Sequence, residues 1–147
     1  MKRIKLGKDV GISRTNHGFC SLCGEKMRWG VSVGSVSNYN RSNAWLHYDC
    51  LVNLPELIKQ GKIKTRWNKN DTKDNLIILK QTKKGHNGNY CSWCGIHSFA
   101  DMIYLRKKPY KYVVYFHLNC LDNMIAKLKE IIPNSEEIDK KIMVEDL

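Results

Sequence analysis

The spacing of cysteine and histidine constrains the fold of this chain more than any other feature. A Cys-x-x-Cys pair is followed by a His-x-x-Cys pair twice, and these two quartets use all six cysteines. They are Cys20, Cys23, His47 and Cys50, and then Cys91, Cys94, His117 and Cys120. The copies are offset by 71 residues at the first pair and by 70 at the second, which indicates an internal repeat.

Each quartet offers three sulfurs and one imidazole, the donor set of a closed, tetrahedral structural zinc site. We therefore expect two structural Zn²⁺ ions. A disulfide framework is the alternative use of six cysteines, but it does not explain a histidine placed three residues before the last cysteine in both copies. His17 is an alternative to His47 as a ligand of the first site.

The repeat predicts an α+β protein of two small zinc-stabilised modules. Units of roughly 60 to 70 residues bury little apolar surface and usually need a staple such as zinc. The predicted segments are a basic, loose lead-in (residues 1–18), module 1 (19–81), a linker (82–89), module 2 (90–132) and an acidic tail (133–147). The linker has no apolar residue, so we expect the modules to move relative to each other.

Alternation of apolar with polar residues, together with the positions of proline and glycine, predicts short β-hairpins and helices. The predicted strands are residues 29–36, 44–46, 63–67, 101–106 and 111–116. In module 1 a helix begins at His47, breaks near Asn53, resumes at Pro55 and ends before Gly61, and another helix follows over residues 71–81. In module 2 one helix runs from His117 to about Ile132, and Ser135 caps a last acidic helix.

The charge of the chain favours a polyanionic partner. The formal net charge is +11, and the first 132 residues alone carry 23 basic and 9 acidic residues. Two Cys3His zinc sites would lower the charge of that part from +14 to about +12. Such a field attracts nucleic acids, whereas the alternative is a lysine-rich surface that serves solubility alone.

Basic and aromatic residues near the ligands are the candidates for nucleic-acid contact. In module 1 a polar loop carries Tyr39 and Arg41, and in module 2 a basic turn joins two predicted strands. The full set of candidates is Arg14, Lys26, Arg28, Tyr39, Arg41, Lys107, Lys108, Tyr110 and Lys111. An ordinary polar surface loop is the alternative interpretation of residues 37–43. Trp45 and Trp67 are expected in the core.

The gaps between the ligand pairs, 23 and 22 residues, are too long for a Cys2His2 finger and fit a treble-clef-like or LIM-like site. Residues 14–80 resemble the PARP-type zinc finger. The matching features are Cys20 and Cys23, the glycine-containing strand over 30–34, the loop over 35–43, Trp45-Leu46-His47-Tyr48-Asp49-Cys50-Leu51, and Arg66-Trp67 before a helix. Module 2 keeps the ligands and Phe116-His117-Leu118-Asn119-Cys120-Leu121 but has no later tryptophan, so it resembles a diverged copy.

The resemblance implies binding to DNA breaks or ends through phosphate contacts and through apolar loop residues that stack on exposed bases. The family carries an arginine on the first strand after the Cys-x-x-Cys pair. That place falls near Ser32 or Val33 in this chain, where Arg28 is the available substitute. We expect a non-enzymatic zinc-finger protein that recognises double-stranded DNA with nicks, ends or irregular structure rather than base sequence. The competing hypothesis is an adaptor that docks on a protein such as a polymerase.

Catalysis is not expected, because closed metal sites leave no position for water or substrate and commit every thiol. No apolar run approaches the roughly 18 residues that a membrane span needs. We therefore expect a soluble intracellular protein, in the nucleus of a eukaryote or in the cytoplasm and nucleoid of a prokaryote or phage.

Removal of metal is expected to unfold the chain, because the binding free energy of a structural zinc ion, on the order of 10 kcal/mol, becomes folding free energy in small modules. Circular dichroism during titration with a chelator measures this, and re-addition of Zn²⁺ should restore the signal. A native spectrum that persists after metal removal is proven by elemental analysis would contradict the expectation.

Overall fold

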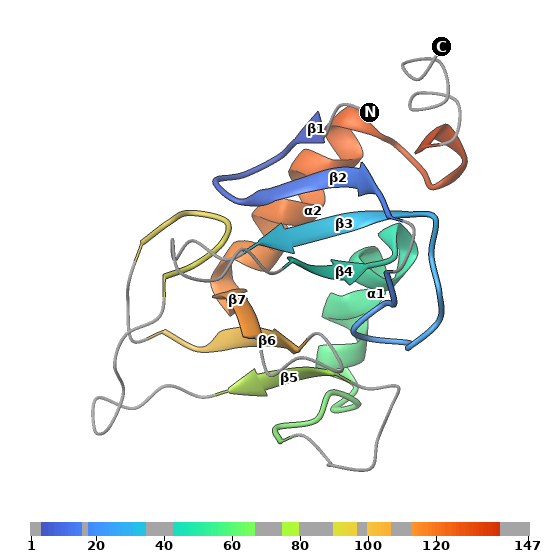
Figure 1. Cartoon of the computed structure of the whole chain (residues 1–147). Coiled ribbons are helices and arrows are strands. Elements are labelled where there is room, and N and C mark those ends of the chain that lie inside the picture. The colour runs from blue at the N-terminus through green and yellow to red at the C-terminus, as the bar shows by residue number, and fades with distance from the viewer. Residues whose placement is uncertain are drawn as a thin grey trace.

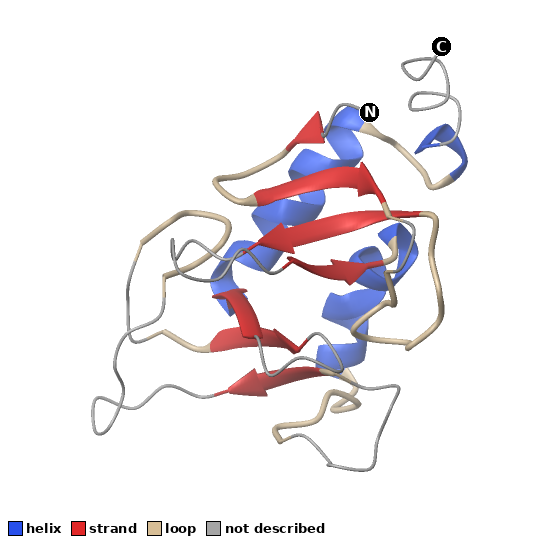
Figure 2. Cartoon of the chain, viewed as in Figure 1, coloured by secondary structure: helices blue, strands red, loops and turns tan. Residues whose placement is uncertain are grey.

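The computed structural model describes residues 4–15, 18–34, 43–66, 75–79, 90–96, 100–106 and 113–138. These residues form seven strands in two antiparallel sheets, two long α-helices, one 3-10 helix and a short helical segment over residues 136–138 (Figure 1). The two long helices lie on one side of the sheets. In Figure 2 this side is behind the sheets, and the other side faces the viewer. The predicted α+β class with small sheets and a few helices is therefore confirmed.

The first sheet has the order β1-β2-β3-β4 and consists of β1 (Ile4–Lys5), β2 (Val10–Arg14), β3 (Trp29–Gly34) and β4 (Asn43–Leu46). The expectation of a loose lead-in before residue 18 is wrong for its described part, since that part supplies two of these strands. Val10 and Ile12 alternate with small or polar residues and are 0% and 1% exposed. Because basic residues surround Val10 and Ile12, the sequence does not indicate a strand here, although the segment forms a short strand with one buried face.

Helix α1 (Tyr48–Lys59) is continuous, so the predicted break near Asn53 is wrong. Pro55 lies inside the helix and removes one backbone hydrogen bond. Leu51 and Leu54 are both 0% exposed, and their burial on one helix face favours a single uninterrupted element. The helix ends as predicted before Gly61, whose φ of 68° places it in the left-handed region.

The second sheet has the order β5-β6-β7 and consists of β5 (Leu76–Leu79), β6 (Met102–Arg106) and β7 (Val113–His117). The helix predicted over residues 71–81 is wrong, because its described part is β5. A short apolar run does not distinguish a buried strand from a buried helix by periodicity. The strand predicted over 63–67 is also wrong over residues 63–66, while Trp67 lies outside the described residues.

The 3-10 helix η1 (Leu118–Cys120) leads into α2 (Leu121–Ile131), which agrees with the helix predicted from His117. Pro133 follows the helix after one residue, Ile132, close to the predicted end. The cap of the next turn is Asn134 rather than Ser135, since the Glu137 backbone N–H donates to Asn134 Oδ1 at 3.1 Å. Ile138 is buried as predicted, and Ile142 lies outside the described residues.

The two halves of the chain have the same strand register. In the first sheet Ile12 pairs with Val31, which pairs with Leu46. The corresponding residues of the second sheet, Ile78, Ile103 and Phe116, pair in the same way. The repeat seen in the metal ligands therefore extends to three strands and the following helix, β2-β3-β4-α1 and β5-β6-β7-α2.

Each half also completes the other through a reciprocal pair of backbone hydrogen bonds. The Asp9 N–H, just before β2, donates to the Ser92 carbonyl at 2.7 Å, and the Asn75 N–H, just before β5, donates to the Ser21 carbonyl at 2.7 Å. Ser21 lies between the first two ligands of its half, and Ser92 lies at the same place in the other half. We call these four residues the interlock.

The two halves share one hydrophobic core, which contains buried residues of both sheets and both helices. The Tyr48 hydroxyl at the start of α1 donates to the Ile132 carbonyl at the end of α2, at 2.5 Å. The expectation that two modules move relative to each other is thus wrong for the described residues. The linker itself lies outside them, and the predicted segment boundaries stay a prediction. No helix in the described ranges is long and apolar enough to cross a bilayer.

A shared core predicts that damage to one half destabilises both. Leu54→Ala in α1 or Leu128→Ala in α2 removes a fully buried side chain and should cost about 2 to 5 kcal/mol. Denaturation followed by amide exchange in β3 and in β6 should give one common transition for each variant. Asn53→Ala, at an exposed neighbour on α1, is the control and should change stability by less than about 0.5 kcal/mol. Separate transitions for the two halves would contradict a common core.

Candidate metal centres and basic surface

The first two ligands of each quartet lie on a tight turn, which we call knuckle 1 (residues 20–24) and knuckle 2 (residues 91–95). Knuckle 1 connects β2 to β3, and knuckle 2 lies between β5 and β6. The glycine N–H closes each turn onto the carbonyl of the first cysteine, from Gly24 to Cys20 and from Gly95 to Cys91, both at 2.8 Å. These glycines have φ values of 79° and 75°, which residues with a side chain rarely adopt.

The last two ligands of each quartet come from the junction between a strand and a helix. His47 directly follows β4 and Cys50 lies in the first turn of α1, while His117 ends β7 and Cys120 ends η1. A spacing of three residues at a helix start places both side chains on one face. The two pairs thereby converge on one point in each half.

The distances within each quartet match the edges of a tetrahedron around a metal ion. All four donor atoms of each quartet lie within 4.8 Å of one another. His47 Nδ1 lies 3.2 Å from Cys23 Sγ and 3.7 Å from Cys50 Sγ. The corresponding His117 distances are 3.4 and 3.7 Å, and the sulfurs of Cys91 and Cys120 are 3.8 Å apart.

An ion with bonds of about 2.3 Å to sulfur and about 2.0 Å to nitrogen would space its tetrahedral ligands about 3.8 Å apart for two sulfurs and about 3.5 Å for sulfur and nitrogen. The six cysteines are free thiols, so the disulfide alternative is wrong. Both quartets can hold a metal ion, and in the first His47 lies with the three cysteines, while the alternative ligand His17 lies outside the described residues.

Backbone N–H groups surround the first sulfur of each quartet. Cys20 Sγ accepts from the Leu22 N–H at 3.4 Å, and Cys91 Sγ accepts from the Trp93 and His117 N–H groups at 3.3 and 3.2 Å. Donors of this kind stabilise a thiolate and orient it toward a metal. The folded backbone therefore prepares the anionic ligand that a metal requires.

Without a bound cation, the cysteine thiols of one quartet do not all lose their protons together. The hydrogen bond with Cys50 lowers the pKa of Cys20 to about 4, and the same bond, with burial, raises the pKa of Cys50 strongly. In the second quartet burial raises the pKa of Cys91, and burial followed by repulsion from Cys91 raises the pKa of Cys120. A divalent ion would replace the retained protons and allow each cluster to become fully anionic.

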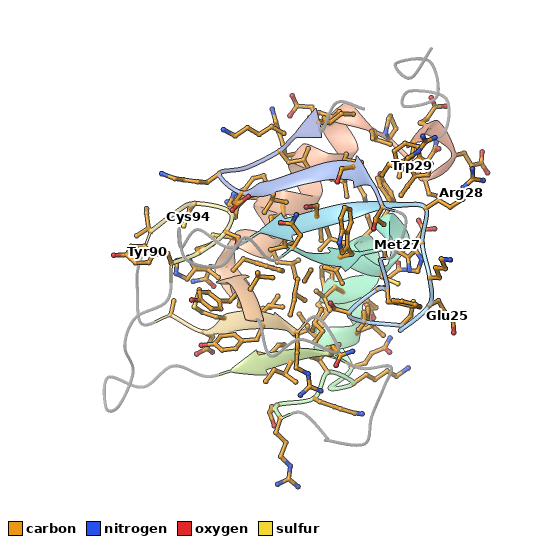
Figure 3. All side chains as sticks on the ribbon, viewed as in Figure 1. Glu25, Met27, Arg28, Trp29, Tyr90 and Cys94 are labelled. Atoms are coloured by element: carbon orange, nitrogen blue, oxygen red, sulfur yellow. The ribbon has the colours of Figure 1, made fainter. Side chains whose placement is uncertain are left out.

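Three predicted nucleic-acid residues gather around the entry to β3. Arg14 pairs with Trp29 in the sheet, its Cζ lies 5.0 Å from the centre of the Trp29 ring, and the Thr15 N–H donates to the Arg28 carbonyl at 2.9 Å. Lys26 is exposed and lies in the sequence between Glu25 and Met27, which Figure 3 labels. Arg14, Lys26 and Arg28, which are all exposed, form what we call the basic edge.

The other predicted contacts lie outside the described residues. These are Tyr39, Arg41, Lys107, Lys108, Tyr110 and Lys111. Two tryptophans are expected in the core. Trp45 is half-buried and packs against the core, while Trp67 lies outside the described residues.

Sequence reasoning missed the exposed aromatic residues Phe19 and Tyr90, which directly precede the first cysteine of each knuckle. It also missed Lys8, which packs against knuckle 2. Alignment of the two copies on their ligands would have found the aromatic pair, because both residues occupy the same repeat position. No such signal marks Lys8, since the contact joins opposite halves of the repeat.

Comparison of this chain with models of protein families, with curated proteins and with solved structures finds no match.

Metal analysis of the purified protein should give two equivalents per chain. Cys23→Ser or His47→Ala should each reduce this to one, while His17→Ala, which tests the alternative ligand, should leave two. Apparent affinity should rise with pH, because thiols with a raised pKa must lose protons when the metal binds. Competition with a chromophoric chelator at several pH values measures both quantities. Two equivalents in His47→Ala together with one in His17→Ala would contradict the ligand assignment.

Proposed function

We propose that both quartets bind Zn²⁺ and that the protein is a non-enzymatic zinc-module protein that binds DNA. Three thiolates with one imidazole favour zinc among the common divalent ions, and the ligand distances fit its tetrahedral shell. With four protein ligands each site is closed, so the metal has no position for a substrate or an activated water molecule. The metal sites thus serve structure, and binding belongs to the surface around them.

The observation that carries the proposal is the basic edge, where the end of β2 places Arg14 beside the segment that leads into β3 and carries Lys26 and Arg28. Two of these residues are arginines, whose guanidinium groups bind phosphate oxygens in a bidentate manner. The half-buried Trp29 contributes a flat ring beneath Arg14. The net charge of +11 adds a long-range attraction for the DNA backbone.

The chemistry of this edge favours contact with phosphates rather than readout of bases. It lies where β2 ends and β3 begins, and neither described helix carries it. Phosphate contacts fix position and carry no sequence information. We therefore propose recognition of DNA structure, such as nicks, ends or irregular duplex, in keeping with the resemblance of residues 14–80 to the PARP-type finger.

A binding assay on intact, nicked and single-stranded DNA across a range of salt tests the proposal. The double variant Arg14→Ala/Arg28→Ala should weaken binding to all three and reduce the slope of log K against log salt by about 2 on duplex DNA, since each lost phosphate contact removes about 0.9. The control Lys59→Ala/Lys129→Ala removes the same charge from exposed positions on the two helices and should reduce the slope less.

If the two double variants weaken DNA binding equally, the basic edge contributes only its charge and not a specific contact with the DNA. Absence of salt-dependent binding by the unaltered protein would reject DNA binding altogether. Equal affinity for nicked and intact duplex would remove the preference for breaks and leave DNA binding in place.

Docking on a protein is the second candidate, and one observation favours it. At knuckle 2 the exposed residues include Tyr90 and Ile96, and exposed apolar side chains often mark protein contacts. Affinity capture from lysate with and without nuclease separates the candidates. Partners retained after nuclease treatment and lost in Ile96→Asp would support docking, whereas partners lost on nuclease treatment would support nucleic acid.

A further inference from the structure

Within the part of the chain that the structure describes, the exposed large apolar side chains directly flank the two knuckles. They are Phe19, Tyr90 and Ile96, which are 59%, 54% and 62% exposed. Phe19 and Tyr90 occupy the same repeat position, one residue before the first ligand. An aromatic ring left in water forgoes the roughly 1.5 to 3 kcal/mol that its burial would contribute, and the chain does so twice at one position.

The backbone that carries each ring is held in place. Phe19 forms an antiparallel bridge with Lys26, and the next residue, Cys20, donates its N–H to the Glu25 carbonyl at 3.0 Å. In the second half the Cys91 N–H donates to the Ile96 carbonyl at 3.2 Å. Since the adjacent cysteine is also a metal ligand, each ring is displayed by a rigid support.

A lysine lies beside each ring-bearing knuckle. At knuckle 1 it is Lys26, the bridge partner of Phe19. At knuckle 2 it is Lys8, whose N–H donates to the Trp93 carbonyl at 3.0 Å and whose side chain passes over Gly95, where a Cβ would lie 2.5 Å from Lys8 Cδ. Both lysines are exposed, and they come from positions that the repeat does not relate.

An exposed ring and an exposed lysine therefore occur at each knuckle, with the lysine bridged to the ring-bearing residue at knuckle 1 and lying over Gly95 at knuckle 2. We call these combinations the ring–lysine pairs, Phe19 with Lys26 and Tyr90 with Lys8. Figure 3 shows their knuckles on opposite flanks of the molecule, with Glu25 marking knuckle 1 and Tyr90 marking knuckle 2. A ring offers a surface for a base, and an ammonium group offers a partner for the adjoining phosphate.

We propose that each ring–lysine pair binds one unpaired nucleotide, with the base on the ring and the phosphate at the lysine. This inference rests on the proposed DNA-binding function and names the substrate feature as unpaired nucleotides in tails or gaps. Two pairs on opposite flanks suit a DNA with unpaired segments at two separated points. Glu25 occupies the repeat position of Ile96, and its carboxylate opposes phosphate at knuckle 1, so the Tyr90 pair should carry the larger share.

The experiment compares three DNA probes: a blunt duplex, the same duplex with a single-stranded tail at each end, and the tail alone. The tail contains 2-aminopurine, whose fluorescence is quenched when the base stacks. Phe19→Ala and Tyr90→Ala should each weaken binding to tailed and single-stranded DNA about 5- to 150-fold, the equivalent of roughly 1 to 3 kcal/mol per stacked base. Blunt-duplex affinity should stay unchanged, and the protein-dependent change in 2-aminopurine fluorescence should diminish.

Matched variants separate stacking from other roles. Phe19→Tyr and Tyr90→Phe keep the ring and should keep tail binding, while Ile96→Ala removes exposed apolar surface beside Tyr90 without removing a ring and should have little effect. Lys8→Ala should weaken tail binding and lower its salt dependence. Two equivalents of metal in every variant establish that the knuckles are intact. A tail of RNA in place of DNA shows which nucleic acid supplies the unpaired base.

Equal losses on blunt and tailed DNA, or an Ile96→Ala loss as large as that of Tyr90→Ala, would overturn the stacking inference and leave DNA binding standing. The same holds if the alanine variants bind every probe as the unaltered protein does. If the unaltered protein binds none of the probes, the proposed function itself fails. Loss confined to tailed and single-stranded probes, with rescue by the ring-keeping variants, supports the inference.

Discussion

The interlock is the interaction on which the rest of the structure depends. Each knuckle carbonyl, at Ser21 or Ser92, accepts the N–H of the residue that begins a strand in the opposite half. That residue then uses its own carbonyl to extend its sheet, because Asp9 accepts from Gly34 and Asn75 accepts from Arg106. Metal ligands, sheet edges and the shared core are thereby linked through a few backbone groups.

This arrangement explains how a chain with two small metal sites becomes one body. A single repeat of this size would leave a sheet face and a helix stripe without cover. The second repeat supplies that cover, and α1 meets α2 beneath both sheets. The architecture resembles a symmetric dimer whose two subunits have been joined in one chain, with the same contact made twice in reciprocal directions.

Much of the local structure could be predicted from the sequence. The ligand quartets, β3, β4, β6, β7 and the start of each helix follow from spacing and from alternation of apolar residues. Basic residues surround β2, so the sequence does not indicate a strand there. The apolar run of β5 has no clear period, so it fits a helix as well as a strand. Helix α1 passes through Pro55 because burial of Leu51 and Leu54 outweighs a local preference.

What the sequence could not reveal is mostly long-range. Nothing in the residues near Asp9 indicates that its N–H meets Ser92, so the union of the halves was missed. The lysine beside knuckle 2 was missed for the same reason, because Lys8 lies far from it in sequence. In contrast, charge predicts Arg14 as a contact and the family resemblance predicts Arg28, and the structure adds that the end of β2 and the residue before β3 bring them together.

The interlock also determines when the first half can complete its fold during synthesis. The residues just before β2 leave the ribosome well before their partner in knuckle 2, which follows the whole first repeat in the sequence. Contacts between distant parts of a sequence form late, because the intervening loop must first be closed. The first sheet therefore waits for its contact with the second half until knuckle 2 has been made.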